Sequence, residues 1–207
     1  METLRALRYS FYLIFHPFDG FWDLKHEKRG NLKAAIIIVF LLCVTFILRR
    51  QLTGFIFNTV KLIELNIFLE ISSVIVPFLL WCIANWCLTT LMDGEGSFKD
   101  IVITSAYALT PIIIINLPLI PFSNVITAEE GAFFYFFNSL AVAWSALLMV
   151  IGTSVVHQYS MRKAIFTCIL IVVGMGIIIF IALLFFNLIH QMYWFFYSIY
   201  KEISLRM

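Results

Sequence analysis

The stretch DGEGSFKDIVITSAYALTPIIIINLPLIP, residues 93–121, decides the fold of this chain. It is a short polar loop that opens directly into a long apolar segment, which Pro111, Pro118 and Pro121 interrupt. A proline inside a helix removes a backbone hydrogen bond and bends the helix. Such breaks occur in membrane helices where neighbouring groups satisfy the freed backbone. We therefore expect a bent membrane helix here, preceded by a polar turn.

The composition of the whole chain fits a membrane protein. Of its 207 residues, 62% are apolar and 13% are charged, and the mean hydropathy is +0.99. Soluble domains contain roughly 45–50% apolar and ~25% charged residues. The net charge of +2 lacks the strong basic field of a nucleic-acid-binding protein, so we predict no nucleic acid partner. The four cysteines lie in apolar runs and are expected to pack as small apolar side chains.

Five apolar segments are long enough to cross a bilayer core, which takes ~20 helical residues. We predict spans at about 34–48, 67–92, 101–122, 133–156 and 164–189. The first is short and is closed by Arg49 and Arg50, whose long side chains can reach the interface. The predicted fold is all-α: a polytopic membrane protein with a five-helix transmembrane bundle.

The two ends of the chain have the composition of a membrane interface. Residues 1–33 mix Lys and Arg with aromatic residues, and we predict an N-terminal interfacial segment in contact with membrane lipid. Residues 34–189 form the predicted five-span domain, and 190–207 form an aromatic C-terminal tail at the far interface. No cofactor and no metal site are predicted.

Lys and Arg counts predict the orientation. With the N-terminus inside, nine of these residues fall on the inner side and five on the outer side. Positive residues prefer the cytoplasmic side of a membrane. We predict a multi-pass protein of the cell membrane with a cytoplasmic N-terminus and an extracellular C-terminus.

The polar loop is the first candidate site. Asp93, Glu95 and Asp100 surround Gly94 and Gly96, which permit a tight turn. In addition, Ser97-x-x-Asp100 is a capping-box pattern that predicts the start of the third span. A charged glycine turn that caps a helix needs no ligand, and a partner-binding or ion-binding role is the alternative interpretation; Lys99 belongs to the same candidate set.

Polar side chains inside the apolar segments are the second candidate set, because a charge facing lipid costs about 2.5–3.5 kcal/mol. Glu70 is interpreted as an interfacial residue, with a proton carrier as the alternative. Asn85 and Asn138 are expected to make interhelical hydrogen bonds, and His157 to lie at the rim of the fourth span. Asn116 completes the set.

Two motifs resemble the Yip family of membrane proteins. GEGSFK at residues 94–99 leads into AYALTP at 106–111, which is similar to the Tyr-x-x-x-Pro signature in the third span of that family. Tyr107 and Pro111 carry the signature, and Ala106 stands where the family has glycine. FHPFDGFWDLKHEKRG at 15–30 and WCIANWCLTTLMD at 81–93 look like the bacterial, Gram-positive branch.

The resemblance implies five spans, a cytoplasmic N-terminus and a non-enzymatic scaffold or accessory role. Its implied partner is another membrane protein, and bacterial relatives suggest subunits of a sugar ABC importer. Small residues recur at four-residue spacing in the fourth span, which favours close packing within the bundle, with a homo-oligomer as the alternative. We find no motif of a known hydrolase or nucleotide-binding enzyme and predict no enzymatic activity. The alternative is a small channel or transporter that uses the proline-kinked second and third spans.

Overall fold

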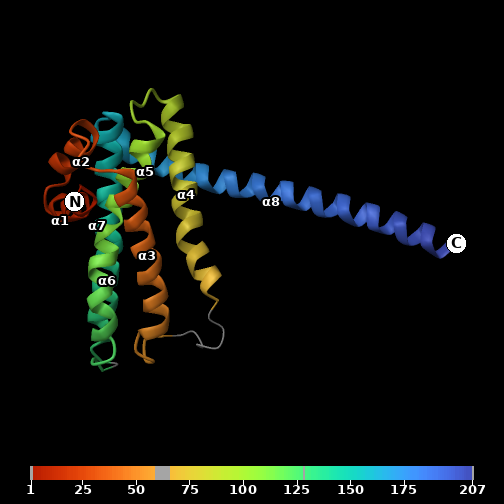
Figure 1. Cartoon of the computed structure of the whole chain (residues 1–207), viewed down its shortest axis with the longest axis horizontal. Helices are drawn as coiled ribbons and strands as arrows, with labels where there is room; N and C mark the ends of the chain where they lie inside the picture. Colours follow the sequence, from red (N-terminus) through yellow and green to blue (C-terminus); the bar gives the residue numbers. More distant parts are fainter. Residues whose placement is uncertain (1, 59–65, 128, 207) are drawn as a thin grey trace.

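The computed structural model describes residues 2–58, 66–127 and 129–206. Within these residues the chain is all-helical and contains no strand (Figure 1). The helices are α1 (Glu2–Phe15), α2 (Pro17–His26), α3 (Leu32–Leu52), α4 (Ile67–Leu91), α5 (Phe98–Ala108), α6 (Thr110–Phe122), α7 (Gly131–His157) and α8 (Met161–Arg206). Five helical segments are long and apolar enough to cross a membrane, with α5 and α6 together forming one of them. The predicted fold class is confirmed.

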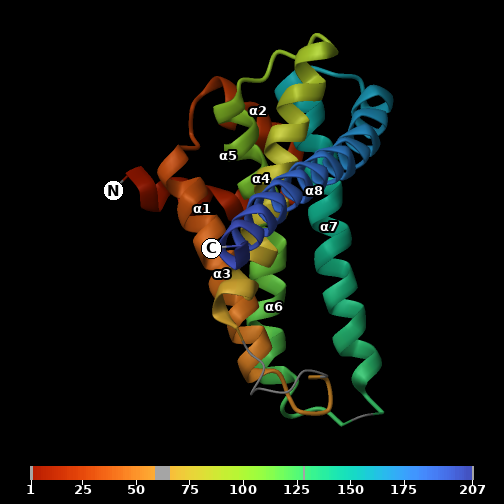
Figure 2. The ribbon, with the colours of Figure 1, turned by 90° about the vertical axis from the view of Figure 1, so that its right-hand side faces the viewer.

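Helices α3, α4, α6 and α7 run side by side along one axis, and α5 prolongs α6 (Figures 1 and 2). Helices α1 and α2 pack against α5 and α7 toward one end of this bundle. We call this the near end; it also carries residues 92–97 and the α7–α8 turn. The far end is where α3 ends and where α4 and α7 begin. The two ends present different groups of polar side chains.

The N-terminal segment folds into two helices that share a core with the bundle. Leu13 of α1 and Phe21 of α2 are fully buried, while Phe15 and Trp22 are exposed. The Tyr9 hydroxyl donates to Asp23 Oδ2 at 2.9 Å and so ties α1 to α2. Burial, together with this hydrogen bond, raises the pKa of Tyr9 above its usual range. The exposed aromatic side chains suit a helix pair that lies along a membrane interface.

Helix α3 is longer than the sequence predicts. Asn31 caps it, because its Oδ1 accepts the backbone N–H of Ala34 at 2.6 Å. The helix then runs for 21 residues, so it includes Arg49 and Arg50 in its last turn. At about 1.5 Å per residue, a helix of this length is long enough to cross a bilayer core.

The third span is two helices. Helix α5 ends at Ala108 and α6 begins at Thr110, with the break at Leu109, two residues before Pro111. Pro77 lies inside α4, and Pro118 and Pro121 lie inside α6, without ending those helices. The third span is therefore interrupted at Leu109, and Pro111 lies in the first turn of α6.

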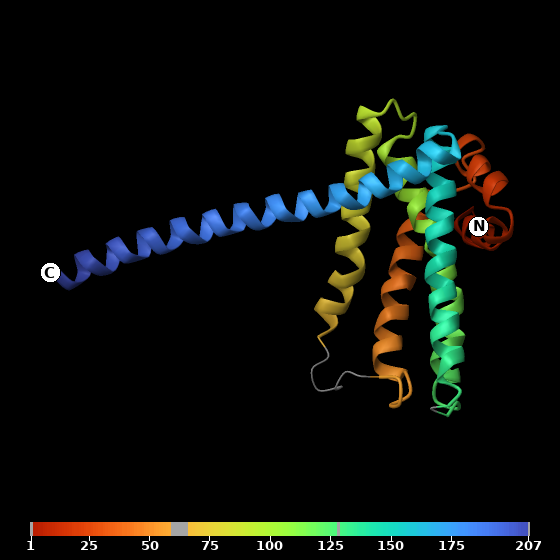
Figure 3. The ribbon, with the colours of Figure 1, turned by 180° about the vertical axis from the view of Figure 1, so that it is seen from behind.

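Helix α8 joins the predicted fifth span and the predicted aromatic tail into one helix of 46 residues. No glycine or proline follows Gly176 in the sequence, so nothing there ends the helix. Its first part packs on α4 and α7. Its outer part leaves the bundle at a wide angle, and all side chains from 179 to 205 are exposed (Figures 1 and 3).

Candidate functional site

Residues 92–97, which we call the polar loop, connect α4 to α5 at the near end. Asp93 has a left-handed backbone, with φ of 57°, a conformation that Asp tolerates better than most residues. The N–H of Gly94 then donates to the carbonyl of Thr89 at 2.8 Å. Asp93, and neither glycine, supplies the positive φ of this turn.

The two glycines instead permit close contact with α7. A Cβ added at Gly94 would lie 2.6 Å from His157 Nδ1 and 2.7 Å from Tyr159 Oη. One added at Gly96 would lie 2.5 Å from Val156 Cγ1 and 2.7 Å from His157 Cε1. Real Cβ atoms do not approach this closely, so the loop backbone rests directly on the end of α7 because both positions lack a side chain.

His157 is the residue on which the polar loop rests. It is the last residue of α7, as expected for the rim of the fourth span, but it is only 2% exposed. The backbone N–H of Gly96 donates to its Nδ1 at 3.3 Å. Since Nδ1 accepts, the neutral ring carries its proton on Nε2. No signal in the sequence separates this histidine from one at a solvated helix end.

Three further side chains hold the polar loop from other elements. Lys25 of α2 pairs with Glu95 at 3.3 Å and donates to the Val156 carbonyl at 2.9 Å. Tyr159, in the α7–α8 turn, and Lys163 of α8 donate to the Met92 carbonyl at 3.0 and 2.9 Å. Burial raises the pKa of Tyr159, and Asp93 adds to the effect, so its hydroxyl stays a donor. The loop is thereby fixed to α2, α7 and α8.

The predicted capping box is present at the start of α5. Ser97 Oγ accepts the N–H of Asp100 at 3.3 Å, and Asp100 Oδ2 accepts the N–H of Ser97 at 3.2 Å. Lys99, next in the first turn, is exposed, as are Asp93 and Glu95. The loop thus has a fixed backbone and charged side chains that point outward.

Tyr107 and Pro111 lie in the protein interior. Tyr107 is fully buried, and its hydroxyl donates to the Ala6 carbonyl at 3.0 Å, which ties α5 to α1. Pro111 is also buried, and it has no N–H to donate to the Tyr107 carbonyl one turn earlier. Thr110 Oγ donates to that carbonyl instead, at 2.7 Å. The signature residues thus shape the core and are not exposed.

Asn85 faces the same region from α4. Its Oδ1 and His157 Nε2 are buried, have no hydrogen-bond partner among the described residues, and line a common cavity of about 10 Å³. A volume near 10–15 Å³ is about that of one water probe, so no substrate fits there. Within the described chain, no group of three or more His, Cys, Asp or Glu side chains is placed to hold a metal ion.

The other polar residues within the spans lie elsewhere. Glu70 Oε1 pairs with Arg50 Nε at 3.1 Å, and Asn138 Oδ1 accepts Arg49 Nη1 at 2.8 Å, both at the far end. The latter is an interhelical bond between α3 and α7, as expected for Asn138. Asn116 is buried in α6 and donates from Nδ2 to the Ile112 carbonyl at 2.9 Å. The structure therefore does not bring the four predicted residues to one site.

Comparison with known proteins gives one match. The model of a family described as the Yip1 domain matches residues 11–184, from α1 into α8 and across the polar loop. Neither a curated protein nor a solved structure matches the chain.

Proposed function

Because this chain belongs to the Yip1 domain family, we propose that it is a non-enzymatic membrane scaffold that binds another membrane protein through its near end. Family membership and the five apolar helices support a multi-pass membrane protein. The proposed binding role rests on the polar loop, which combines a fixed backbone with exposed charged side chains.

The polar loop has the properties of a docking surface. Its backbone is held by Tyr159 and Lys163, which donate to the Met92 carbonyl, and its Glu95 side chain pairs with Lys25, so little conformational freedom is lost when a partner binds. Its exposed groups carry both signs of charge, with Glu95 on the loop and Lys99 beside it. Paired charges at the rim of an interface select a partner and speed association.

The partner we propose is a subunit of a sugar ABC importer. The basis is the resemblance of residues 15–30 and 81–93 to the bacterial, Gram-positive branch of the family. The near end would then face the cytoplasm of a cell membrane, in agreement with the Lys and Arg count.

The alternative function is that of a small channel or transporter. Its proposed path uses Glu70, Asn85, Tyr107 and Asn116. Glu70 lines a pocket at the far end, whereas Asn85 lines the cavity of about 10 Å³ beside His157. Tyr107 and Asn116 line neither of these two cavities. This separation favours the scaffold.

Cross-linking mass spectrometry on native membranes tests the scaffold. We expect reproducible links from Lys25, Lys99 or Lys163 to one other membrane protein. Purification in mild detergent should recover that protein with the wild type. Reversing a rim charge places like charges together, so Lys99→Glu should lower recovery about tenfold or more.

The matched control is Lys201→Glu, an exposed lysine near the outer end of α8. It should recover the partner as the wild type does. Links confined to the chain or to pairs of its own copies, with no partner recovered, would contradict the proposal and indicate a homo-oligomer. Solute uptake by liposomes that contain the purified chain alone would favour the transporter.

A further inference from the structure

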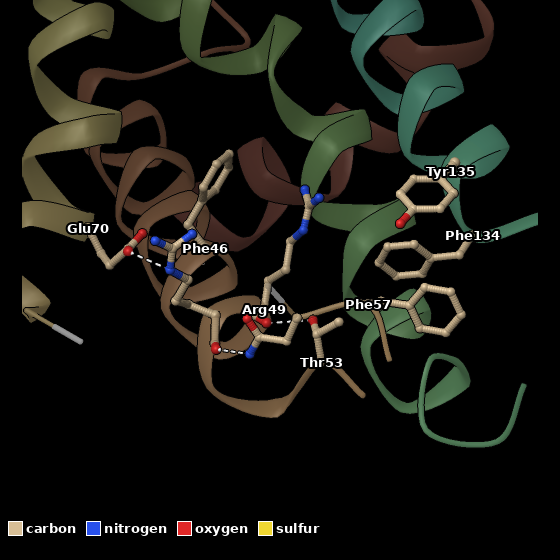
Figure 4. A pocket seen from close by; sticks show the side chains of 9 residues that line it. Phe46, Arg49, Thr53, Phe57, Glu70, Phe134 and Tyr135 are labelled. Atoms are coloured by element: carbon tan, nitrogen blue, oxygen red, sulfur yellow. Dashed lines mark hydrogen bonds and ion pairs between the residues drawn. The ribbon is translucent and has the colours of Figure 1, made fainter. Parts of the chain in front are cut away.

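A pocket of about 310 Å³ lies at the far end, between the last turn of α3 and the first turns of α4 and α7. Its volume is at the lower end of the range for small-ligand pockets, about 300–1,000 Å³. In Figure 4, Arg49 lies between Glu70 on one side and Phe134 and Tyr135 on the other. Among the described residues, the charged side chains that line it are two arginines and one glutamate, which give it a net positive charge.

The two arginines have different partners. Consecutive helical residues point about 100° apart, and here Arg50 pairs with Glu70 of α4 while Arg49 reaches Asn138 of α7. The Arg50 charge is therefore compensated. Asn138 is neutral, and among the described residues no carboxylate forms an ion pair with Arg49. Within the described part of the chain, Arg49 thus keeps an uncompensated charge at the wall of the pocket.

With respect to the residues that the structure describes, Arg49 also keeps free donors. A guanidinium has five N–H donors in a planar fork that fits a phosphate or carboxylate, and the structure shows one of them bonded to Asn138 Oδ1. That bond holds the side chain in place. A partly buried, oriented arginine with free donors is the chemistry of an anion site.

The position of the pocket favours a membrane lipid as the source of the anion. It lies where three apolar helices end or begin, which is the depth of the phosphate groups when these helices cross a bilayer. Phe134 and Phe57 form one wall of the pocket. Phe134 is buried and stacks on Phe57, with 4.9 Å between the ring centroids, and this packing holds the wall in place. Beside it, Phe133 and Phe136 are exposed and can contact acyl chains.

We propose that this pocket binds the phosphate of an anionic phospholipid, with Arg49 as the direct ligand. Asn138 positions Arg49, and the Arg50–Glu70 pair forms the opposite wall. This site is at the opposite end of the bundle from the proposed docking surface, so either can fail without the other.

Thermal unfolding of the purified chain in a neutral detergent tests the proposal, because a ligand that binds the folded state raises the unfolding temperature. The probe is dihexanoyl-phosphatidylglycerol, titrated against wild type, Arg49→Gln and Arg49→Lys. We expect a rise for the wild type and about tenfold weaker apparent binding for Arg49→Gln. Arg49→Lys should fall between them, since it keeps the charge but loses the fork. Arg162→Gln, an exposed arginine at the near end, is the matched control and should bind like the wild type.

Three compounds identify the source of the anion. Dihexanoylglycerol has the acyl chains without phosphate, and inorganic phosphate and glycerol 3-phosphate have the phosphate without chains. None of the three should match the lipid. Equal stabilisation by dihexanoylglycerol would show an apolar site, and equal stabilisation by glycerol 3-phosphate would show a site for a soluble phosphate compound. Either result, or equal lipid binding by wild type and Arg49→Gln, would overturn the proposal.

Discussion

At the scale of single residues, the near end is organised by the contact of Gly94 and Gly96 with His157. Both glycines are needed because their backbones touch a buried side chain, and His157 in turn accepts the N–H of Gly96. The proposed docking surface therefore depends on residues that a partner would not touch.

Gly94→Ala should destabilise the protein by about 1–3 kcal/mol, the usual cost of overpacking a close contact. The added Cβ would lie within 3.0 Å of His157, Tyr159 and Thr89 at once. The measurement is the free energy of unfolding in detergent, together with hydrogen exchange of residues 92–97. Gly176→Ala is the control, because its Cβ would meet nothing within 4 Å and alanine favours a helix by about 1 kcal/mol. Equal stability of the two variants would refute this account of the loop.

Some of these residues could be predicted from the sequence and others could not. The capping box is a local pattern, because Ser97 and Asp100 interact within one turn, so it could be read directly. Asn138 inside an apolar helix needs a partner, and its predicted interhelical bond is present. The same reasoning predicted a bond for Asn85, but the Oδ1 of Asn85 has no partner among the described residues. The contacts of His157 and Lys25 join segments far apart in the chain, and no local pattern specifies them. Lipid exposure of each helix face depends on the same distant contacts.

At the scale of elements, the α5–α6 junction explains how a membrane helix can break without an unpaired carbonyl. Pro111 cannot donate to the Tyr107 carbonyl, and Thr110 Oγ takes the place of the missing N–H. The sequence contains both residues, and the proline predicted the bend. The role of Thr110 follows only from the structure, in which its buried hydroxyl contacts the Tyr107 carbonyl.

A double-mutant cycle tests whether the Thr110 hydroxyl replaces the N–H that Pro111 lacks. Thr110→Val should cost about 0.5–1.5 kcal/mol, because it removes the Thr110 hydrogen bond to the Tyr107 carbonyl and leaves that carbonyl only the Leu109 N–H. In a Pro111→Ala background the alanine N–H can bond the same carbonyl, so the cost of Thr110→Val should be much smaller. The measurement is the free energy of unfolding of the four proteins. Additive effects would show that Thr110 does not compensate for the proline.

Elements also differ in how well their lengths could be predicted. The limits of α4 and α7 lie close to the predicted 67–92 and 133–156, because their apolar runs and their ends coincide. Helix α3 extends beyond the predicted span of 34–48, because Arg49 and Arg50 close the apolar run but do not end the helix. Helix α8 passes residue 189 for the same reason: hydropathy falls there, but helix propensity does not.

At the scale of the whole molecule, α8 is the element whose direction decides the topology. Its outer end lies beside the middle of the bundle, level with neither end (Figures 1 and 3). If the bundle axis follows the membrane normal, the outer end of α8, which carries Lys201 and Glu202, would sit near mid-depth. Each such charge costs about 2.5–3.5 kcal/mol in a bilayer. Turning α8 along the bundle axis would carry these charges out of the bilayer core, because Lys201 lies about 60 Å along the helix from Met161 and the core is about 30 Å thick.

We therefore expect α8 to cross the membrane, with its C-terminus opposite α2. Gly174 and Gly176 lie where the helix leaves α4, and glycines ease bending at that point. The measurement is labelling of single cysteines by a membrane-impermeant maleimide, with the four native cysteines replaced by alanine. Lys201→Cys should react in intact cells, and Lys28→Cys only after the membrane is opened. Ile179→Cys, within the apolar part of α8, is the control and should stay unlabelled in both conditions. If Lys201→Cys and Lys28→Cys became accessible together, α8 would not cross, four helical segments would span the membrane, and the predicted extracellular C-terminus would be wrong.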